Sequence, residues 1–561
     1  MSEPVPPIAA SEPRSSLRIF VGVILLALAY LLPGLVGHDP WKQDEAYSFG
    51  IIYNMYRTGD FVVPTLAADP FMEKPPAYYI TATGMVHLLH RWLPLHDAAR
   101  LTTALYLGLA LVFTGLLSRA TWGRGYGGLG VLLLLSTLGL LQNGHFMITD
   151  TALTAGVAIG LYGLVRARES IAWGGLWLGT GAGLAFLSKG LLGPGILGLT
   201  GLTLPAVFGP WRRLGYLKAL LVAVGVSLPW LLVWPTALYL RDPSLFTLWF
   251  WDNNFGRYLG TAGLGSPARD LFWLRTFPWV TFPVLPMALW TLWRRRADAF
   301  ASDGVRVTLV ASIIGWAVLF ASNTARDLYA LPLLAPLAVI GAGAIRRLPA
   351  WVVAGGYWGS AVLFGLLAGL LWFLWLHGLA VGHAPELGLI GKHLPPDFQP
   401  TWRWGAFLGA VVLQIGWTWV LVHFRPPQPA ALVIWPAGLT LVWGLVATIH
   451  LPWLDQAKSY RTVFTELKHA LPAHYRCVAD LKDMRLRESE RGMLHYFAGV
   501  TTEHIKRPQD TDCDLIVVEA PVRAHGTEVD LGPSWRRIWE GRRRDDRRDL
   551  FILFQRIRTA G

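Results

Sequence analysis

The sequence has few charged residues and no motif for nucleotide or zinc chemistry. Only 15% of its 561 residues are Asp, Glu, Lys or Arg, and 53% are apolar. Soluble domains carry about 25% charged residues, so a soluble enzyme of this size is excluded. The sequence contains no Walker A, Rossmann or kinase signature, no H-E-x-x-H and no G-x-S-x-G. Nucleotide-driven chemistry and zinc proteolysis therefore lack support, and a membrane protein is the class that remains.

Cysteine is also scarce, since Cys477 and Cys513 are the only two. Two cysteines without companion ligands exclude a zinc ribbon. Both lie in residues 451–561, which we expect outside the cytosol, where a disulfide is permitted. A disulfide and a pair of neighbouring thiols both stay open.

Acidic residues are unevenly placed along the chain. Residues 451–561 hold 17 of the 36, although they are about a fifth of the length. This predicts a polytopic α-helical membrane domain at 19–450, a cytoplasmic N-terminus at 1–18, and a small soluble domain at 451–561. The last region alternates helical and strand patterns, which indicates an α/β fold. Lys and Arg cluster at the ends of apolar runs, so the net charge of +13 indicates membrane topology and no nucleic-acid partner.

A membrane span needs about 20 mostly apolar residues. Segment 76–93 is short and polar, and placing it in the interface puts the basic clusters on one side, as the positive-inside rule expects. The N-terminus is then cytoplasmic, and residues 37–98 and 451–561 lie on the far side of the membrane. No internal repeat supports a transporter. This topology predicts about thirteen spans: 19–36, 101–118, 127–146, 151–165, 172–188, 190–208, 217–236, 277–293, 307–322, 328–345, 351–376, 404–423 and 431–450.

Segment 37–98 is too long for a simple connector and holds seven acidic residues. Asp44 and Glu45 follow the first span and precede Tyr47, an arrangement suited to holding a polar substrate, although helix capping is the simpler alternative. Further on, Glu73 and Lys74 precede two prolines, which force an extended backbone. Lys74 can bind a phosphate as a point charge, with a lipid headgroup as the alternative.

Other ionisable residues stand alone beside apolar segments. Asp150 lies between two spans, where an ionisable group suggests function and an N-cap is the alternative. Lys189, Arg257 and Arg326 are isolated cations on the expected outer side. A phosphate-binding site explains all three, whereas each one alone is explained by snorkelling to the interface.

Five separated motifs resemble one known family. They are the Asp44-Glu45 pair, the segment Glu73 to Tyr79, Asp150, Lys189-Gly190, and the segment Tyr329 to Pro332. In this order they resemble the GT-C membrane glycosyltransferases, and more narrowly the bacterial branch related to protein O-mannosyltransferases. That branch includes the transferases that add 4-amino-4-deoxy-L-arabinose to lipid A.

The resemblance implies inverting transfer of a sugar from a polyprenyl phosphate on the periplasmic side of a bacterial inner membrane, with lipid A or another lipid as acceptor. We also expect the enzyme to be a monomer. Asp44 would be the leading catalytic carboxylate, with Asp150 and Glu45 beside it. With a hydroxyl acceptor Asp44 would act as a general base, and with a phosphate acceptor it would orient the substrates. The predicted donor-phosphate ligands are Lys74, Lys189, Arg257 and Arg326. The predicted cavity residues are Glu73, Tyr47, Tyr78, Tyr329 and Asn254.

One position departs from the aminoarabinose group. The segment before the residue matching Arg257 usually carries a His there, whereas this chain has Asn254. The sugar therefore stays open, and the alternative function is transfer of another sugar to a protein hydroxyl or envelope glycan. The sequence requires no cofactor, and a divalent cation at Glu73 is an open alternative.

Overall fold

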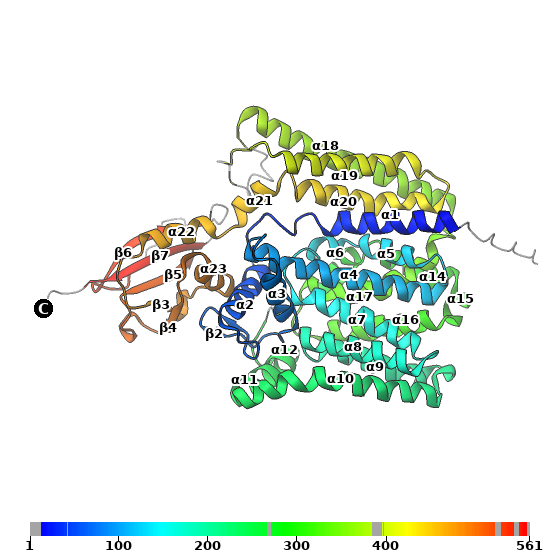
Figure 1. Cartoon of the computed structure of the whole chain (residues 1–561), viewed down its shortest axis with the longest axis horizontal. Helices are drawn as coiled ribbons and strands as arrows, with labels where there is room; N and C mark the ends of the chain where they lie inside the picture. The colour runs from blue at the N-terminus through cyan, green and yellow to red at the C-terminus, as the bar shows by residue number, and fades with distance from the viewer. Residues whose placement is uncertain are drawn as a thin grey trace, which may run out of the picture.

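The structure is a computed structural model of the 561-residue chain. It describes residues 13–41, 43–265, 267, 271–383, 395, 398–521, 529–543 and 549–557. The expected cytoplasmic segment 1–18 lies mostly outside these residues, and so does part of the expected outer loop 377–402. A bundle of long helices forms one part of the molecule and a β-sheet with its helices forms the other (Figure 1).

The bundle explains the apolar composition. Within the described residues, eight helical segments are long and apolar enough to cross a membrane. They run side by side along the long axis of the molecule (Figure 1). The chain is therefore a multi-pass membrane protein. The eight segments are α4 (Leu95–Trp122), α8 (Ile171–Lys189), α10 (Leu214–Arg241), α16 (Asp303–Ala321), the turn η3 (Asp327–Ala330) with α17 (Leu331–Ile345), α18 (Ala350–Val381), α19 (Trp404–His423), and the turn η4 (Pro429–Val433) with α20 (Ile434–Val446).

Five expected spans coincide with shorter or interrupted helices, so the number thirteen stays a prediction. The expected span 127–146 is broken after Leu135, and the span 277–293 is broken after Val280. The shorter helices are α1 (Pro13–Leu31), α5 (Gly127–Leu135), α6 (Leu138–Asn143), α7 (Thr149–Arg166), α9 (Leu192–Val207), α13 (Phe272–Val280) and α14 (Val284–Arg294). The connecting helices are η1 (Gly209–Trp211), α11 (Pro243–Thr247), η2 (Leu248–Gly256), α12 (Arg257–Leu259) and α15 (Arg296–Ala301).

Segment 37–98 folds into two short helices at one end of the bundle, facing the sheet (Figure 1). They are α2 (Asp44–Thr58) and α3 (Ala77–Leu89), and a hairpin of β1 (Thr65–Leu66) and β2 (Asp69–Pro70) lies between them. With 13 residues, α3 is shorter than the roughly 20 that a span needs.

The C-terminal part is built on a five-stranded sheet with the order β4-β3-β5-β7-β6. The first three strands are parallel, and β7 runs antiparallel to both β5 and β6. Residues 515–520 of β5 are all buried, which explains the unbroken apolar run there. The strands are β3 (Val478–Leu481), β4 (Thr502–Ile505), β5 (Leu515–Pro521), β6 (Trp535–Gly541) and β7 (Asp549–Arg556), and the helices are α21 (Leu451–Lys458), α22 (Arg461–Ala470), η5 (Lys482–Met484), α23 (Glu488–Ala498) and η6 (Pro508–Asp510).

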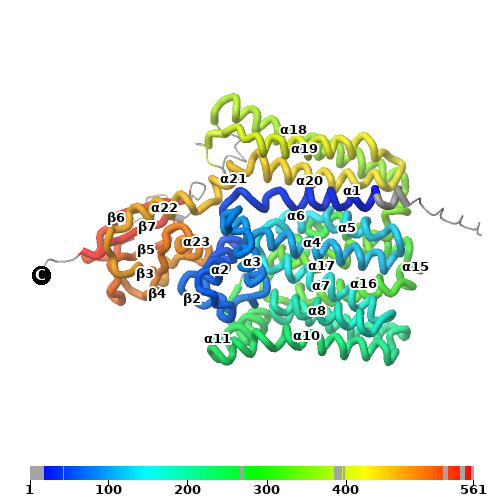
Figure 2. The backbone as a smooth tube through the Cα atoms, in the orientation of Figure 1, coloured from blue at the N-terminus to red at the C-terminus, as the bar shows by residue number. Residues whose placement is uncertain are grey.

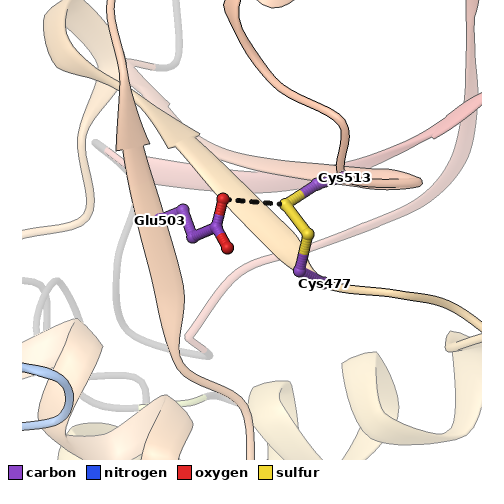
Figure 3. A group of neighbouring side chains, drawn as sticks. All are labelled: Cys477, Glu503 and Cys513. Carbon is purple, nitrogen blue, oxygen red and sulfur yellow. Dashed lines mark hydrogen bonds between the residues drawn. A yellow bond between two sulfur atoms is a disulfide. The ribbon is translucent and has the colours of Figure 1, made fainter.

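The two cysteines form a disulfide, which settles the alternative left open by the sequence. Figure 3 shows the Cys477–Cys513 bond and the carboxylate of Glu503, whose Oε2 lies 3.4 Å from the Sγ of Cys513. A disulfide sulfur carries no proton, so this approach is a polar contact. The two sulfurs are bonded to each other and are not available as thiolate ligands for a metal.

The sheet part docks on the bundle through α23, which crosses α2 (Figure 2). A Cβ added to Gly50 would lie 2.9 Å from the Cα of Gly492, so the two helices touch backbone to backbone. Beside this crossing, the hydroxyl of Ser489 donates to the carbonyl of Gln43 at 2.9 Å. The C-terminal part therefore contacts the turn that precedes Asp44.

Candidate active site

The first turn of α2 presents Asp44 at the end of the bundle. Asp44 and Glu45 are the first two residues of this helix, where negative charge is stabilised by the helix dipole. Asp44 is only 8% exposed. Tyr47, one turn further on, donates a hydrogen bond from its hydroxyl to Oδ1 of Asp44 at 2.7 Å.

Arg326, the residue before η3, binds the same carboxylate. Its Nη1 donates to Oδ1 of Asp44 at 2.8 Å, and its Nη2 pairs with Oδ2. This two-point geometry is the arrangement that makes arginine–carboxylate pairs strong and directional. Asp44 is thus held by Arg326 from one side and by Tyr47 from its own helix.

Glu73 and Lys74 approach Asp44 from the loop before α3. Lys74 is buried, donates to the hydroxyl of Tyr47, and lies 3.8 Å from Oδ1 of Asp44. Arg257, at the start of α12, reaches over to Glu73 with a distance of 2.8 Å between Nη1 and Oε1. These contacts join three segments that are far apart in sequence.

Lys189, the last residue of α8, is the fourth cation of the cluster. Its ammonium pairs with the buried Asp150 at the start of α7 and lies 3.9 Å from the centre of the Tyr329 ring. Tyr329 in turn receives a hydrogen bond from Nη2 of Arg257 at 3.4 Å. The ring of Tyr329 is therefore shared by the Lys189 and Arg257 sides of the cluster.

Asn254 supports the turn after Lys189. Its Oδ1 accepts from the backbone N–H of Leu191 at 3.1 Å, and its Nδ2 donates to the carbonyl of Trp249 at 2.9 Å. Gly190 sits against this side chain with a φ of +66°, so a larger residue at 190 would meet both backbone strain and a clash. Asn254 therefore lies beside the predicted cavity residues and supports the backbone at Gly190 and Leu191.

The charges of the cluster are mutually stabilising. Burial by itself would raise the pKa of Asp44, but the neighbouring Lys74 and Arg326 outweigh it and hold that pKa well below its usual range. Burial likewise opposes ionisation of Glu73, whose pKa is nevertheless lowered by Lys74 and Arg257. Lys74 is buried, yet Glu73 and Asp44 raise its pKa.

With all seven ionisable side chains charged, four cations face three carboxylates. The cations are Lys74, Lys189, Arg257 and Arg326, and the carboxylates are Asp44, Glu73 and Asp150. These seven side chains together therefore carry one net positive charge. Such a site is suited to bind an anion and to stabilise negative charge that develops on it.

Two predicted site residues do not join this cluster. Glu45 is 1% exposed, pairs with Nε of Arg100 at 2.7 Å and accepts from the backbone N–H of Trp41 at 3.0 Å. Tyr78 is fully buried, with its hydroxyl 2.7 Å from that of Thr103. Both therefore lie outside the cluster, with their polar atoms bonded to other protein groups.

Sequence reasoning missed Arg100 of α4, which binds Glu45 of α2 and the segment that precedes α2. It is completely buried and binds Glu45, Asp97 at 2.8 Å, and the carbonyls of Leu35 and His38, both at 3.1 Å. An arginine within the first turns of an apolar helix is costly to bury. That isolated charge was the available signal.

A divalent cation does not fit the residues around Glu73. Its carboxylate is paired with Arg257 at 2.8 Å and with Lys74 at 3.9 Å. A metal ion there would displace or repel both cations. Among the described residues, the one group with three clustered metal-ligand atoms is the disulfide-bonded pair with Glu503.

Comparisons with known proteins identify sequence relatives and a matching fold. No protein-family model matches the chain. A curated relative from Pseudomonas fluorescens, an undecaprenyl phosphate-alpha-4-amino-4-deoxy-L-arabinose arabinosyl transferase, is 26% identical over 449 residues, covering 76% of this chain and 70% of the relative. The transferase of the same name from Pectobacterium atrosepticum is 27% identical over 464 residues, covering 78% and 76%.

The fold matches a solved structure over nearly its whole length. ArnT from Cupriavidus metallidurans in the apo state superposes with a TM-score of 0.65 and 17% identity, covering 96% of this chain and 98% of that one. The same enzyme bound to undecaprenyl phosphate gives a TM-score of 0.62, with coverage of 97% and 98%. The chain thus has the GT-C fold of a multi-pass membrane glycosyltransferase, and its curated relatives are arabinosyl transferases that carry undecaprenyl phosphate in their names.

Proposed function

We propose that this chain transfers a sugar from undecaprenyl phosphate to a phosphate of lipid A, and that the sugar is 4-amino-4-deoxy-L-arabinose. The relatives' names supply the donor and the sugar. The reaction takes place on the periplasmic side of the bacterial inner membrane, with the N-terminus in the cytoplasm. The excess of one positive charge in the cluster supports an anionic substrate there.

The choice of a phosphate acceptor rests on one observation, the hydrogen bonding and ionisation of Asp44. Both of its oxygens are engaged by Arg326, and Tyr47 also donates to Oδ1. Burial works against ionisation, but Lys74 and Arg326 keep the pKa of Asp44 well below its usual range. A general base needs a pKa near the working pH, so Asp44 is a poor base for a hydroxyl acceptor. A phosphate acceptor is already anionic and requires no base.

The reaction then proceeds as one inverting displacement. An oxygen of the acceptor phosphate attacks the anomeric carbon and forms the new C–O bond. The bond from that carbon to the donor phosphate oxygen breaks, and its electron pair leaves with the undecaprenyl phosphate. Lys74, Lys189 and Arg257 neutralise the departing phosphate. Asp44 and Asp150 orient these cations and the sugar, so positioning and charge stabilisation supply the rate.

Mass spectrometry of lipid A tests the proposal directly. Lipid A is compared from cells lacking the protein and from cells producing the wild type, Asp44→Ala or Asp512→Ala. Asp512 is an exposed acidic residue of the C-terminal part and serves as the matched control. We expect an added aminoarabinose mass with the wild type and Asp512→Ala only. Unmodified lipid A in every strain would overturn the acceptor assignment, and the added mass in Asp44→Ala would overturn the mechanism.

A further inference from the structure

A second group of cations lies outside the site described above, on the face of the C-terminal part that meets α2. A cavity of about 340 Å³ is lined by three arginines and two glutamates, namely Arg485, Arg487, Arg491, Glu488 and Glu490, together with Gln43, Leu486 and Ser489. These side chains surround the start of α23. Arginine is the residue best suited to phosphate, because its planar fork of N–H groups matches the phosphate oxygens.

The cavity has one buried donor without a partner. Arg491 is 8% exposed, and its Nε has no hydrogen-bond partner among the described residues. Its Nη1 pairs with Asp69 of β2, and the guanidinium of Arg485 lies 3.5 Å from the same carboxylate. Asp69 therefore ties two of the arginines to the hairpin of segment 37–98 and holds them in place.

The helix itself adds to the attraction for an anion. The N-cap position of α23 is Arg487, whose side chain has no acceptor atom and so cannot cap the first N–H groups. The backbone N–H of Arg487 donates to Glu519 at 3.3 Å, and the N–H groups that follow receive no bond from the N-cap side chain. A helix N-terminus with arginines around it favours a phosphate group. Arg487 is anchored at Nε, 3.6 Å from Glu519, and its side chain is 55% exposed.

This cavity adjoins the candidate active site. Gln43 is the residue before Asp44, and its carbonyl is bonded to Ser489 in the first turn of α23. Glu488 lines the cavity as well, and its pKa is raised by burial and then by the charge of Glu73 in the candidate active site. The cavity uses none of the four cations of the candidate active site.

We infer that this cavity binds a phosphate group of the acceptor. The inference rests on the proposed function, because it assigns the acceptor's phosphate to the C-terminal part and leaves the donor's phosphate to the membrane bundle. The C-terminal part then selects phosphorylated lipid and delivers it next to Asp44. The close crossing of α2 and α23 at Gly50 and Gly492 fixes the distance between the two phosphate sites.

A binding experiment tests the cavity without requiring turnover. Full-length protein in detergent micelles is titrated with lipid A and with enzymatically dephosphorylated lipid A, and tryptophan fluorescence reports binding. The test variant is Arg485→Gln/Arg487→Gln, two residues outside the donor cluster. The matched control is Arg507→Gln, an exposed arginine of the same domain that pairs with Asp510.

Removal of each guanidinium should weaken the binding of lipid A by about tenfold. Dephosphorylated lipid A should bind the wild type and the double variant equally, and Arg507→Gln should match the wild type. Equal binding of phosphorylated lipid A by the wild type and the double variant would overturn the inference. So would competition by phosphatidylglycerol vesicles as strong as by lipid A, because the cavity would then be a general headgroup site.

Kinetics separates this inference from the proposed function. In a transfer assay the double variant should raise the KM for lipid A and leave the KM for the donor unchanged. A rise in the donor KM would overturn the assignment of the cavity to the acceptor. If the wild type binds lipid A through these arginines but transfers no sugar to it, the proposed function fails and the cavity remains a lipid A phosphate site.

Discussion

Arg326 and Asp44 lie 282 residues apart in the sequence and form a two-point ion pair at the end of the helical bundle. Each comes from a segment just outside a long helix, so the pair joins the first outer segment to the η3 turn. Tyr47 adds a third hydrogen bond to the same carboxylate. This arrangement supports the proposed role of Asp44 as a positioning carboxylate, and it underlies the first two predictions.

Arg326→Lys should lower kcat/KM for sugar transfer by about tenfold to a hundredfold, because a lysine keeps the charge but not the fork of donors. Asp44→Asn should lower it at least as much. The measurement is steady-state transfer with purified variants. Arg241→Lys is the control, since its guanidinium is 65% exposed and lies 3.6 Å from Asp60. Wild-type activity in Arg326→Lys would contradict the two-point role.

The pH profile of transfer should be flat where a general base would titrate. Although burial opposes it, Lys74 and Arg326 lower the pKa of Asp44, so this carboxylate stays ionised through neutral pH. Activity should be lost only in acid, as pH falls below the ordinary carboxyl range of about 4. The measurement is kcat against pH at saturating donor and acceptor. A base limb near neutral pH that disappears in Asp44→Asn would identify Asp44 as the base.

Asp455 should make the protein less stable as pH rises. Burial and the charge of Asp39 raise its pKa to about 6, although Trp41 donates to its Oδ1 at 2.9 Å. Between roughly pH 4, the unfolded value, and pH 6 the folded state binds more protons, so stability falls as pH rises through this window.

The variant Asp455→Asn keeps an acceptor for Trp41 and removes the charge. We expect a gain of about 1–3 kcal/mol in the free energy of unfolding at pH 8 and little change at pH 4. Thermal unfolding in detergent at both pH values measures this difference. An equal effect at pH 4 and pH 8 would mean that the carboxyl charge is not responsible.

Gly492→Val should loosen the C-terminal part from the bundle. A Cβ on Gly492 would lie 3.0 Å from Cδ1 of Leu66 and 3.4 Å from the Cα of Gly50, so the crossing has little room for the larger side chain of valine. Overpacking of this kind costs about 1–3 kcal/mol. Limited proteolysis between α21 and α23 should become faster in this variant.

The control for that variant is Gly195→Val, because a Cβ at Gly195 meets nothing within 4 Å. Its proteolysis should match the wild type. If Gly492→Val is as resistant as the control, the close crossing of α2 and α23 does not hold the two parts together.

Much of the candidate site was predictable from single residues. Isolated charges beside apolar segments pointed to Lys189, Arg257 and Arg326, and an acidic pair after a span pointed to Asp44. Such signals depend only on the cost of placing charge near apolar surroundings, which local sequence reveals. Glu45 belongs to the same acidic pair but lies outside the cluster, because its carboxylate forms a buried ion pair with Arg100.

The partner of each charge was not predictable in this way. Local sequence does not say that Asp150 would pair with Lys189, or that α23 would cross α2 at two glycines. The cavity lined by Arg485, Arg487 and Arg491 was missed because its arginines resemble an ordinary solvated surface in the sequence. They become a cavity only where the C-terminal part docks on segment 37–98.

The sequence by itself determined that this is a membrane protein with a polar outer segment and a more charged C-terminal part, because composition and apolar run length decide what water and lipid can accommodate. It also determined which ionisable residues stand near the membrane. Only the tertiary structure decided which carboxylate neutralises which cation, which tyrosine joins the cluster, and that the two cysteines bond. Those outcomes depend on distances between segments that are tens to hundreds of residues apart, and electrostatic interactions are decided by such distances.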